Sequence, residues 1–105
     1  MDKYEITGET RLYNGHLLHR IRRLSDGLLG GWIGSTYNLS QEGSCFIYDD
    51  AIVYEYAQVK DDAQIKDKAV ISDHAIIFGT TEVTNSVEIS GDIKLGSDFI
   101  VIAVG

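Results

Sequence analysis

The chain has 105 residues, of which 44% are hydrophobic and 24% charged, a composition typical of one folded domain and unlike a disordered acidic tail. Its formal net charge of -7 argues against attraction to nucleic-acid phosphates or to an anionic membrane surface. No run of about 18 apolar residues is present, and residues 1–10 lack the basic and apolar zones of a signal peptide. We therefore expect a cytoplasmic protein.

Residues 3–24 predict an antiparallel β-hairpin. Asn14-Gly15 separates two strand-like segments, and both residue types tolerate the positive φ of a two-residue hairpin turn. Neither face of the second strand is cleanly apolar, because three arginines interrupt it. We expect these arginines to pair with carboxylates of the following repeats or of another subunit, and ligand binding is the alternative. They are Arg20, Arg22 and Arg23.

The segment Ser25–Gly43 is rich in glycine, serine and asparagine, which predicts a loop. Its apolar part, residues 28–33, has enough bulk to cover the open end of a core, and it includes Trp32. We predict a cap rather than a phosphate-binding loop, because no helix pattern follows the glycines. Residues 1–44 are thus assigned to the hairpin and Gly-rich cap, and residues 45–105 to the repeats that follow, within one continuous structural domain.

From Ala51 to Val101, a small or apolar residue, any residue and an aliphatic residue recur every six positions, for nine repeats. Each such unit builds a short strand and a corner, and three units close a triangular coil of 18 residues. No segment has a sustained helical period, so we expect essentially no helix. The inward aliphatic residues should stack in columns on the residue 18 positions later. The predicted columns are Val53 with Ile71 and Ile89, Val59 with Ile77 and Leu95, and Ile65 with Val83 and Val101.

The inward position beside the corner becomes larger toward the end of the stack. Ala57 and Ala75 are followed one coil later by Ile93, and Phe99 occupies the next such position. We interpret Ile93 and Phe99 as a plug, because a stack with an exposed apolar end needs an atypical terminal repeat. Cys45 also fits the inward register, so we expect a buried small hydrophobe, with a nucleophile as the alternative.

The six-residue spacing resembles the hexapeptide repeat of left-handed parallel β-helix proteins, from Cys45 to the end of the chain. With the hairpin and Leu29-Gly30-Gly31-Trp32-Ile33 included, nearly the whole chain resembles small phage and bacterial hexapeptide-repeat proteins. The resemblance implies an all-β fold, a left-handed parallel β-helix of about three triangular coils of 18 residues each, preceded by an antiparallel β-hairpin cap. It also suggests an accessory factor that binds or inhibits a host protein, such as a defence component.

Many hexapeptide-repeat proteins are acyltransferases with a histidine base at a trimer interface, and others are zinc enzymes with three histidines across that interface. The repeats here contain one histidine, His74, and no inserted loop to wrap a cofactor, so we assign no catalytic residue, metal ligand or cofactor. An acyltransferase-like or zinc-dependent enzyme using His74 at a subunit interface is the alternative function. We expect the corner carboxylate pairs to be solvated rather than to bind calcium. These pairs are Asp49-Asp50 and Asp61-Asp62.

Outward positions of the repeats carry apolar and aromatic side chains, and the terminal run from Phe99 to Val104 is apolar on both sides. Such patches mark an interface, either with the hairpin or with another chain. We therefore expect a non-catalytic protein-interaction module that self-associates, with a trimer first and a dimer second. The candidate interaction residues are Ile52, Tyr54, Tyr56, Val70, His74, Ile76, Phe78, Ile100, Ile102 and Val104.

Overall fold

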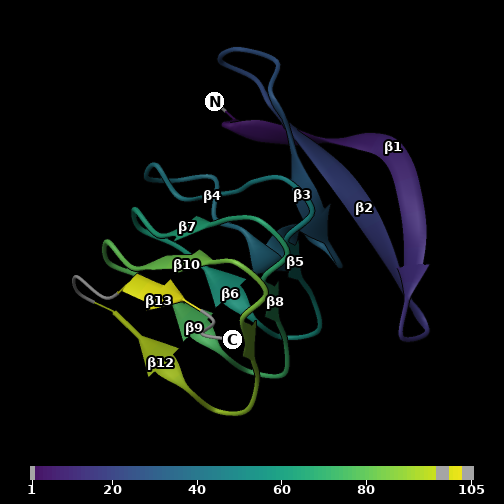
Figure 1. The fold of residues 1–105 in the computed structure, drawn as a ribbon. Helices are drawn as coiled ribbons and strands as arrows, with labels where there is room; N and C mark the ends of the chain where they lie inside the picture. Colours follow the sequence, from purple (N-terminus) through teal and green to yellow (C-terminus); the bar gives the residue numbers. More distant parts are fainter. Residues whose placement is uncertain (1, 97–99, 103–105) are drawn as a thin grey trace.

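The computed structural model describes residues 2–96 and the backbone of residues 100–102. Over these residues the chain forms a stack of parallel β coils with an antiparallel hairpin beside its first coil (Figure 1). A 3-10 turn, η1 (Thr36–Asn38), is the one helical element described. The strands are β1 (Tyr4–Tyr13), β2 (His16–Arg23), β3 (Leu29–Ile33), β4 (Phe46–Ile47), β5 (Ile52–Val53), β6 (Gln58–Val59), β7 (Gln64–Ile65), β8 (Val70–Ile71), β9 (Ile76–Ile77), β10 (Glu82–Thr84), β11 (Glu88–Ile89), β12 (Lys94–Leu95) and β13 (Ile100–Ile102).

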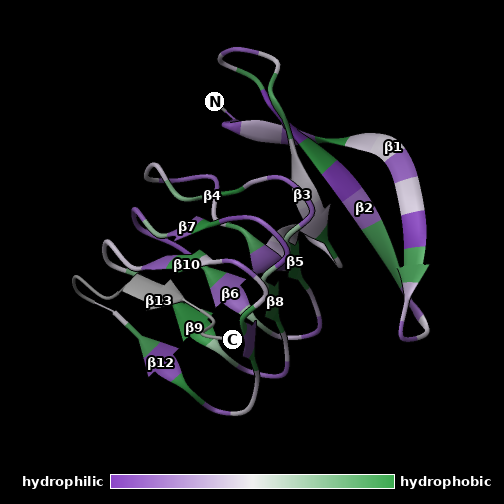
Figure 2. Ribbon diagram, viewed as in Figure 1, coloured by the Kyte–Doolittle hydropathy of each residue, from purple (hydrophilic) through white to green (hydrophobic). Residues whose placement is uncertain are grey.

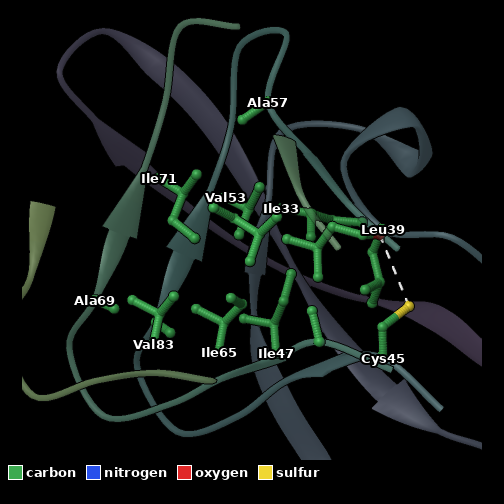
Figure 3. Close-up of a cluster of buried hydrophobic side chains, with 14 of the residues drawn as sticks. Ile33, Leu39, Cys45, Ile47, Val53, Ala57, Ile65, Ala69, Ile71 and Val83 are labelled. Carbon is green, nitrogen blue, oxygen red and sulfur yellow. Dashed lines mark hydrogen bonds between the residues drawn. The ribbon is translucent and has the colours of Figure 1, made fainter. Parts of the chain in front are cut away.

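Strands one coil apart pair in the register predicted from the 18-residue spacing. Val53 pairs with Ile71 and Ile71 with Ile89, and the two other predicted columns pair in the same way, which confirms the inward ladder. The inward side chains fill one continuous core, part of which is drawn in Figure 3. Cys45 lies in this core with no exposed surface, as predicted.

Over the described residues the stack has four coils, one more than predicted, because the Gly-rich segment contributes the first of them. The loop prediction was wrong for Leu29–Ile33, which forms β3 and pairs in parallel with β5. A Cβ at Gly31 would collide with the carbonyl of Ala51, and one at Gly30 would collide with the Phe46 ring. These glycines therefore permit close approach of one coil to the next, which is a different role from turn formation.

The predicted plug is described at one of its two residues. Ile93 lies in the last coil with 40% of its surface exposed, so it does not fill the interior as expected. Phe99 lies outside the described residues. In the preceding coils the equivalent small residues, Ala57 and Ala75, are fully buried.

The corners of the coils share one backbone conformation. Every sixth residue from 43 to 91 has a positive φ, between 58° and 86°. Asp, Asn and Gly tolerate this left-handed region better than other residues, which explains their recurrence. The residues are Gly43, Asp49, Glu55, Asp61, Asp67, Asp73, Gly79, Asn85 and Gly91.

The corner carboxylates link successive coils. The Asp67 carboxylate accepts a hydrogen bond from the backbone N–H of Asn85 at 2.8 Å, 18 residues later, and the Asp67 N–H donates to Asp49 at 3.2 Å. Glu55, Asp61 and Asp73 repeat this arrangement with the N–H groups one coil later. The carboxylates therefore form ladders that hold the corners in register.

The N-terminal strand is fixed to the first coil by a long corner. The Gln41 side chain accepts from the Lys3 and Tyr4 N–H groups and donates to the Tyr4 carbonyl. The buried Tyr4 hydroxyl donates to the Leu39 carbonyl at 2.6 Å, and burial raises the pKa of Tyr4 to about 12. The buried Ile21 joins Tyr4 in the core, so the start of the chain closes this end of the stack.

Substitution of Asp67 tests the corner ladder. Asp67→Ala removes the acceptor for the Asn85 N–H and puts alanine in the left-handed region, so we expect it to lower the free energy of unfolding by about 2 kcal/mol. Asp67→Asn keeps an acceptor and tolerates the conformation, so it should remain close to the unsubstituted protein. Asp67→Gly loses only the acceptor and should fall between them. Denaturant unfolding measures the order, and equal stability of the Ala and Asn variants would contradict it.

Candidate functional site

The hairpin packs on the outward face of the coils. β2 pairs with β3, so the hairpin extends the sheet in the strand order β1-β2-β3-β5-β8-β11 (Figure 1). Leu18 from β2, Trp32 from β3 and Ile52 from β5 form a second buried cluster with Tyr54. The Trp32 Nε1 donor in this cluster has no acceptor among the described residues. Trp32 therefore joins the hairpin to the coils. The prediction that it caps the open end of the core was wrong.

The tip of the hairpin contacts the corner at Tyr54. The Tyr13 and His16 rings meet the Tyr54 ring edge-on, with centroid distances of 5.6 and 5.0 Å. The Asn14 amide donates to the Tyr54 hydroxyl at 3.4 Å, and His16 Nε2 lies 3.6 Å from a Glu55 carboxylate oxygen. These contacts hold the hairpin along the stack, so β1 forms a wall beside the coils.

A groove of about 520 Å³ lies between β1 and the coils, and we call it the hairpin groove. The buried Ile52 and half-buried Val70 supply apolar surface, and the half-buried Tyr13 supplies an aromatic wall. Both signs of charge are exposed along it. The lining residues are Arg11, Tyr13, Asp50, Ile52, Lys68, Val70, Ser86 and Glu88.

Arg11 lies over the start of the groove and has no carboxylate within ion-pair distance in the described part of the chain. Its guanidinium carbon is 5.4 Å from the Trp32 ring centroid and 5.9 Å from that of Tyr13. Arg20 lies at 5.4 Å from the same Trp32 ring, but it is held by the Gly30 carbonyl and by Glu9. Arg11 is thus positioned by aromatic rings and keeps its hydrogen-bond donors free of carboxylates.

Three predicted interaction residues lie under or beside the hairpin. Ile52 and Tyr54 are 4% and 7% exposed, and Val70 is half-buried against the same cluster. The sequence left open whether these residues contact the hairpin or another chain. Packing against the hairpin of the same chain explains their apolar character. Ile52 and Val70 also line the hairpin groove.

Tyr56 and His74 form an exposed column at one corner. Their rings stack at a centroid distance of 5.1 Å with an angle of 11° between planes, one coil apart. His74 Nδ1 lies 3.5 Å from a carboxylate oxygen of Asp92, in the following coil. The same 18-residue register that aligns the core therefore accounts for the contacts of His74.

The remaining predicted interaction residues lie on other faces. Ile76 and Phe78 are half-buried and line a hollow of about 190 Å³ together with Lys60 and Lys94. A Cβ at Gly96 would collide with the Phe78 ring, so this ring covers the glycine. Ile100 and Ile102 lie in β13, which pairs with β10, but their side chains are outside the described part, as is Val104.

The arginine cluster pairs with carboxylates of the hairpin and the turn after it, and not with the repeats as predicted. Arg22 contacts Glu5 at 2.6 Å, and Arg23 contacts Asp26 at 2.8 Å. The Arg23 hydrogen bond and the Leu28 N–H lower the pKa of Asp26 to about 2. These two ion pairs lie at the C-terminal end of β2.

Cys45 and the corner carboxylates have structural partners. Lys3 Nζ lies 3.2 Å from Cys45 Sγ and donates to the Cys45 carbonyl at 2.6 Å, while burial raises the pKa of the thiol. The hydroxyl and N–H of Ser44 hold the Asp62 carboxylate and lower its pKa. Among the described residues, no group of three or more His, Cys, Asp or Glu side chains is arranged to hold a metal ion.

The sequence pattern missed the two charged ends of the hairpin groove, Arg11 and Glu88. Arg11 is separated from Tyr13 by one residue, which places both side chains on the same face of β1. Glu88 continues the outward column of Ile52 and Val70 at 18-residue intervals. Both spacings can be read in the sequence. The sequence does not show that the hairpin packs on this face of the coils, which is what brings Arg11 and Glu88 to the same groove.

Comparison with known proteins gives no family assignment. No protein-family model matches the chain, and no match was found among the curated proteins. In the described ranges, no helix is long and apolar enough to cross a membrane.

The Arg23–Asp26 pair predicts a specific acid sensitivity. Because the folded-state pKa of Asp26 is about 2, below its ordinary value of 3.8, its ionised form stabilises the fold above about pH 4. This contribution is lost as the pH falls from about 4 toward 2. Asp26→Asn keeps an acceptor for the Leu28 N–H but removes the charge, so its unfolding free energy should be lower at pH 6 and fall less in acid.

Denaturant unfolding at pH 6, 4 and 2 measures this difference. Asp50→Asn is the matched control, because no ion pair or hydrogen bond of the Asp50 side chain occurs in the described structure. A pH dependence of Asp26→Asn equal to that of the unsubstituted protein would show that the pair does not contribute.

Proposed function

We propose that this protein is a non-catalytic β-helix module that binds protein and self-associates. The observation that carries the proposal is apolar surface left exposed at and beside the tip of the hairpin. Leu12 and Leu17 are 73% and 50% exposed, and they are directly paired across β1 and β2, so they share one face. Figure 2 shows the hydrophobic colour at this end of both strands.

This exposed surface continues onto the coils. Leu17 and Tyr56 line one hollow of about 320 Å³, and Tyr56 is 65% exposed. We call Leu12, Leu17 and Tyr56 the tip surface. Contiguous apolar and aromatic residues of this kind favour protein contact, because their burial against a partner removes apolar area from water. A second copy of the chain carries the same surface, which supports self-association.

Further support comes from residues that the enzyme alternative would use. His74 stacks on Tyr56 and contacts Asp92, and Cys45 is enclosed in the core beside Lys3. The His74 contacts come from packing between successive coils, and the Cys45 contact comes from packing of the N-terminal segment on the first coil. A trimer before a dimer, a host protein as a further partner and a cytoplasmic location remain predictions from the sequence.

Light scattering tests self-association through the tip surface. We expect the unsubstituted protein to have a mass of at least twice the 11.6 kDa of one chain. The double variant Leu12→Lys with Leu17→Glu keeps the net charge and an attractive cross-strand pair, and it should shift the mass to the monomer. The matched control is Leu24→Lys with Leu28→Glu, which changes residues that are 46% and 40% exposed at the other end of the hairpin.

A monomeric unsubstituted protein would refute self-association. An oligomer that the tip variant leaves intact would show that another surface holds it. Circular dichroism of both double variants verifies that each remains folded.

Metal analysis of the purified protein separates the proposal from the zinc-enzyme alternative. We expect no stoichiometric zinc and no change in metal content for His74→Ala, because the His74 ring stacks on Tyr56 and its Nδ1 faces the Asp92 carboxylate of the same chain. His16→Ala is the matched control. Stoichiometric zinc that is lost in His74→Ala and retained in His16→Ala would support the enzyme instead.

A further inference from the structure

We propose that the hairpin groove binds an extended segment of a partner protein that presents an acidic, an apolar and a basic side chain at alternate positions. This inference rests on the proposed function as a protein-binding module and assigns a site and a partner chemistry to it. It concerns a surface different from the tip surface, since the groove is on the side of the hairpin that carries Arg11 and Tyr13.

The floor of the groove is an outward column that crosses four strands. Trp32 pairs with Ile52, Ile52 with Val70, and Val70 with Glu88. Neighbouring strands are about 4.8 Å apart, so this column spans roughly 14 Å. Arg11 lies over Trp32 at one end, and Glu88 occupies the other. The groove therefore has a cation, an apolar middle and a carboxylate in fixed order.

The two end charges are available to a ligand. Arg20, Arg22 and Arg23 each have a carboxylate neighbour. In the described part of the chain, Arg11 has no carboxylate and Glu88 has no cationic group within ion-pair distance. At the side of the groove, Asp50 and Lys68 occupy equivalent positions on adjacent coils, and their opposite charges offset each other. The four charges sum to zero, so the groove discriminates by the order of charges and not by net attraction.

An extended peptide matches this order and length. Alternate side chains of an extended chain point to one side at intervals of about 6.8 Å, so the first, third and fifth residues span about 14 Å. An acidic first residue would meet Arg11, an apolar third residue would contact Ile52 and Val70, and a basic fifth residue would meet Glu88. The volume of about 520 Å³ is within the range of binding grooves that hold several side chains.

Trp32 provides a direct readout, because it is the only tryptophan and lies beneath Arg11. The probe is the terminally blocked pentapeptide Glu-Ser-Val-Ser-Lys, titrated into the full chain and followed by Trp32 fluorescence and by backbone amide NMR shifts. Three blocked peptides serve as controls: Glu-Ser-Val-Ser-Glu, Lys-Ser-Val-Ser-Lys and Glu-Ser-Ser-Ser-Lys. We expect each control to bind about tenfold more weakly than the probe. The backbone amide shifts that the probe causes in the protein should be centred on Val70 and Glu88.

A charge reversal makes the test specific. Glu88→Lys should reverse the preference, so that Glu-Ser-Val-Ser-Glu binds better than Glu-Ser-Val-Ser-Lys. Glu42→Lys is the matched control, because it makes the same charge change at an exposed turn outside the groove and should leave the preference as it was. Equal binding of all four peptides, no binding of any, or an unchanged preference in Glu88→Lys would overturn the proposal.

The result is distinguishable from a failure of the proposed function. If the peptides do not bind while the tip-surface variant dissociates an oligomer, the groove proposal is wrong and the self-associating module stands. If the peptides bind in the expected order while the protein is monomeric, the groove stands and self-association is wrong.

Discussion

The left-handed backbone conformation at every sixth residue is the constraint on which the structure depends. It turns the chain at each corner, which limits most coil strands to two residues and returns the chain to the same position after 18 residues. A residue such as Asp67 serves this geometry twice, because its backbone tolerates the turn and its carboxylate binds the N–H of Asn85 in the next coil. Register errors are disfavoured, since a shift would break the inward apolar column and the corner hydrogen bonds together.

The first coil shows how the regular stack is joined to the hairpin. β3 pairs in parallel with β5 on one side and antiparallel with β2 on the other, so one sheet crosses the boundary placed after residue 44. At the corner of this coil, Asn38 of η1 is fully buried. Its side chain accepts from the Gly34 and Ser35 N–H groups and donates to the Glu55 and Ala57 carbonyls, which satisfies a polar side chain inside the stack.

The repeat period in the sequence predicted which residues stack inward, but it left open which outward face of the coils the hairpin covers. The columns of Val53, Val59 and Ile65 followed from spacing, because one repeat length determines every inward contact. The role of Gly30 and Gly31 did not, since glycine is equally suited to a turn and to close approach between coils, and local composition does not separate the two. Nor did spacing show which outward face the hairpin covers, because that depends on how β2 pairs with β3. The sequence therefore predicted the core residues together, but among the groove residues it indicated Ile52 and Val70 and missed Arg11 and Glu88.

Stacking in register also determines what an outward face can recognise. Each coil contributes one side chain per column, so the order of residues at 18-residue intervals becomes an order of chemical groups about 4.8 Å apart along the stack. A column on an open face offers little enclosure, as the hollow of about 190 Å³ beside Ile76 and Phe78 shows. The hairpin changes this for the face carrying Ile52, Val70 and Glu88, because β1 adds a second wall and a cation at one end. The regular coils thereby acquire a groove whose two ends carry opposite charges, which the coils without the hairpin do not provide.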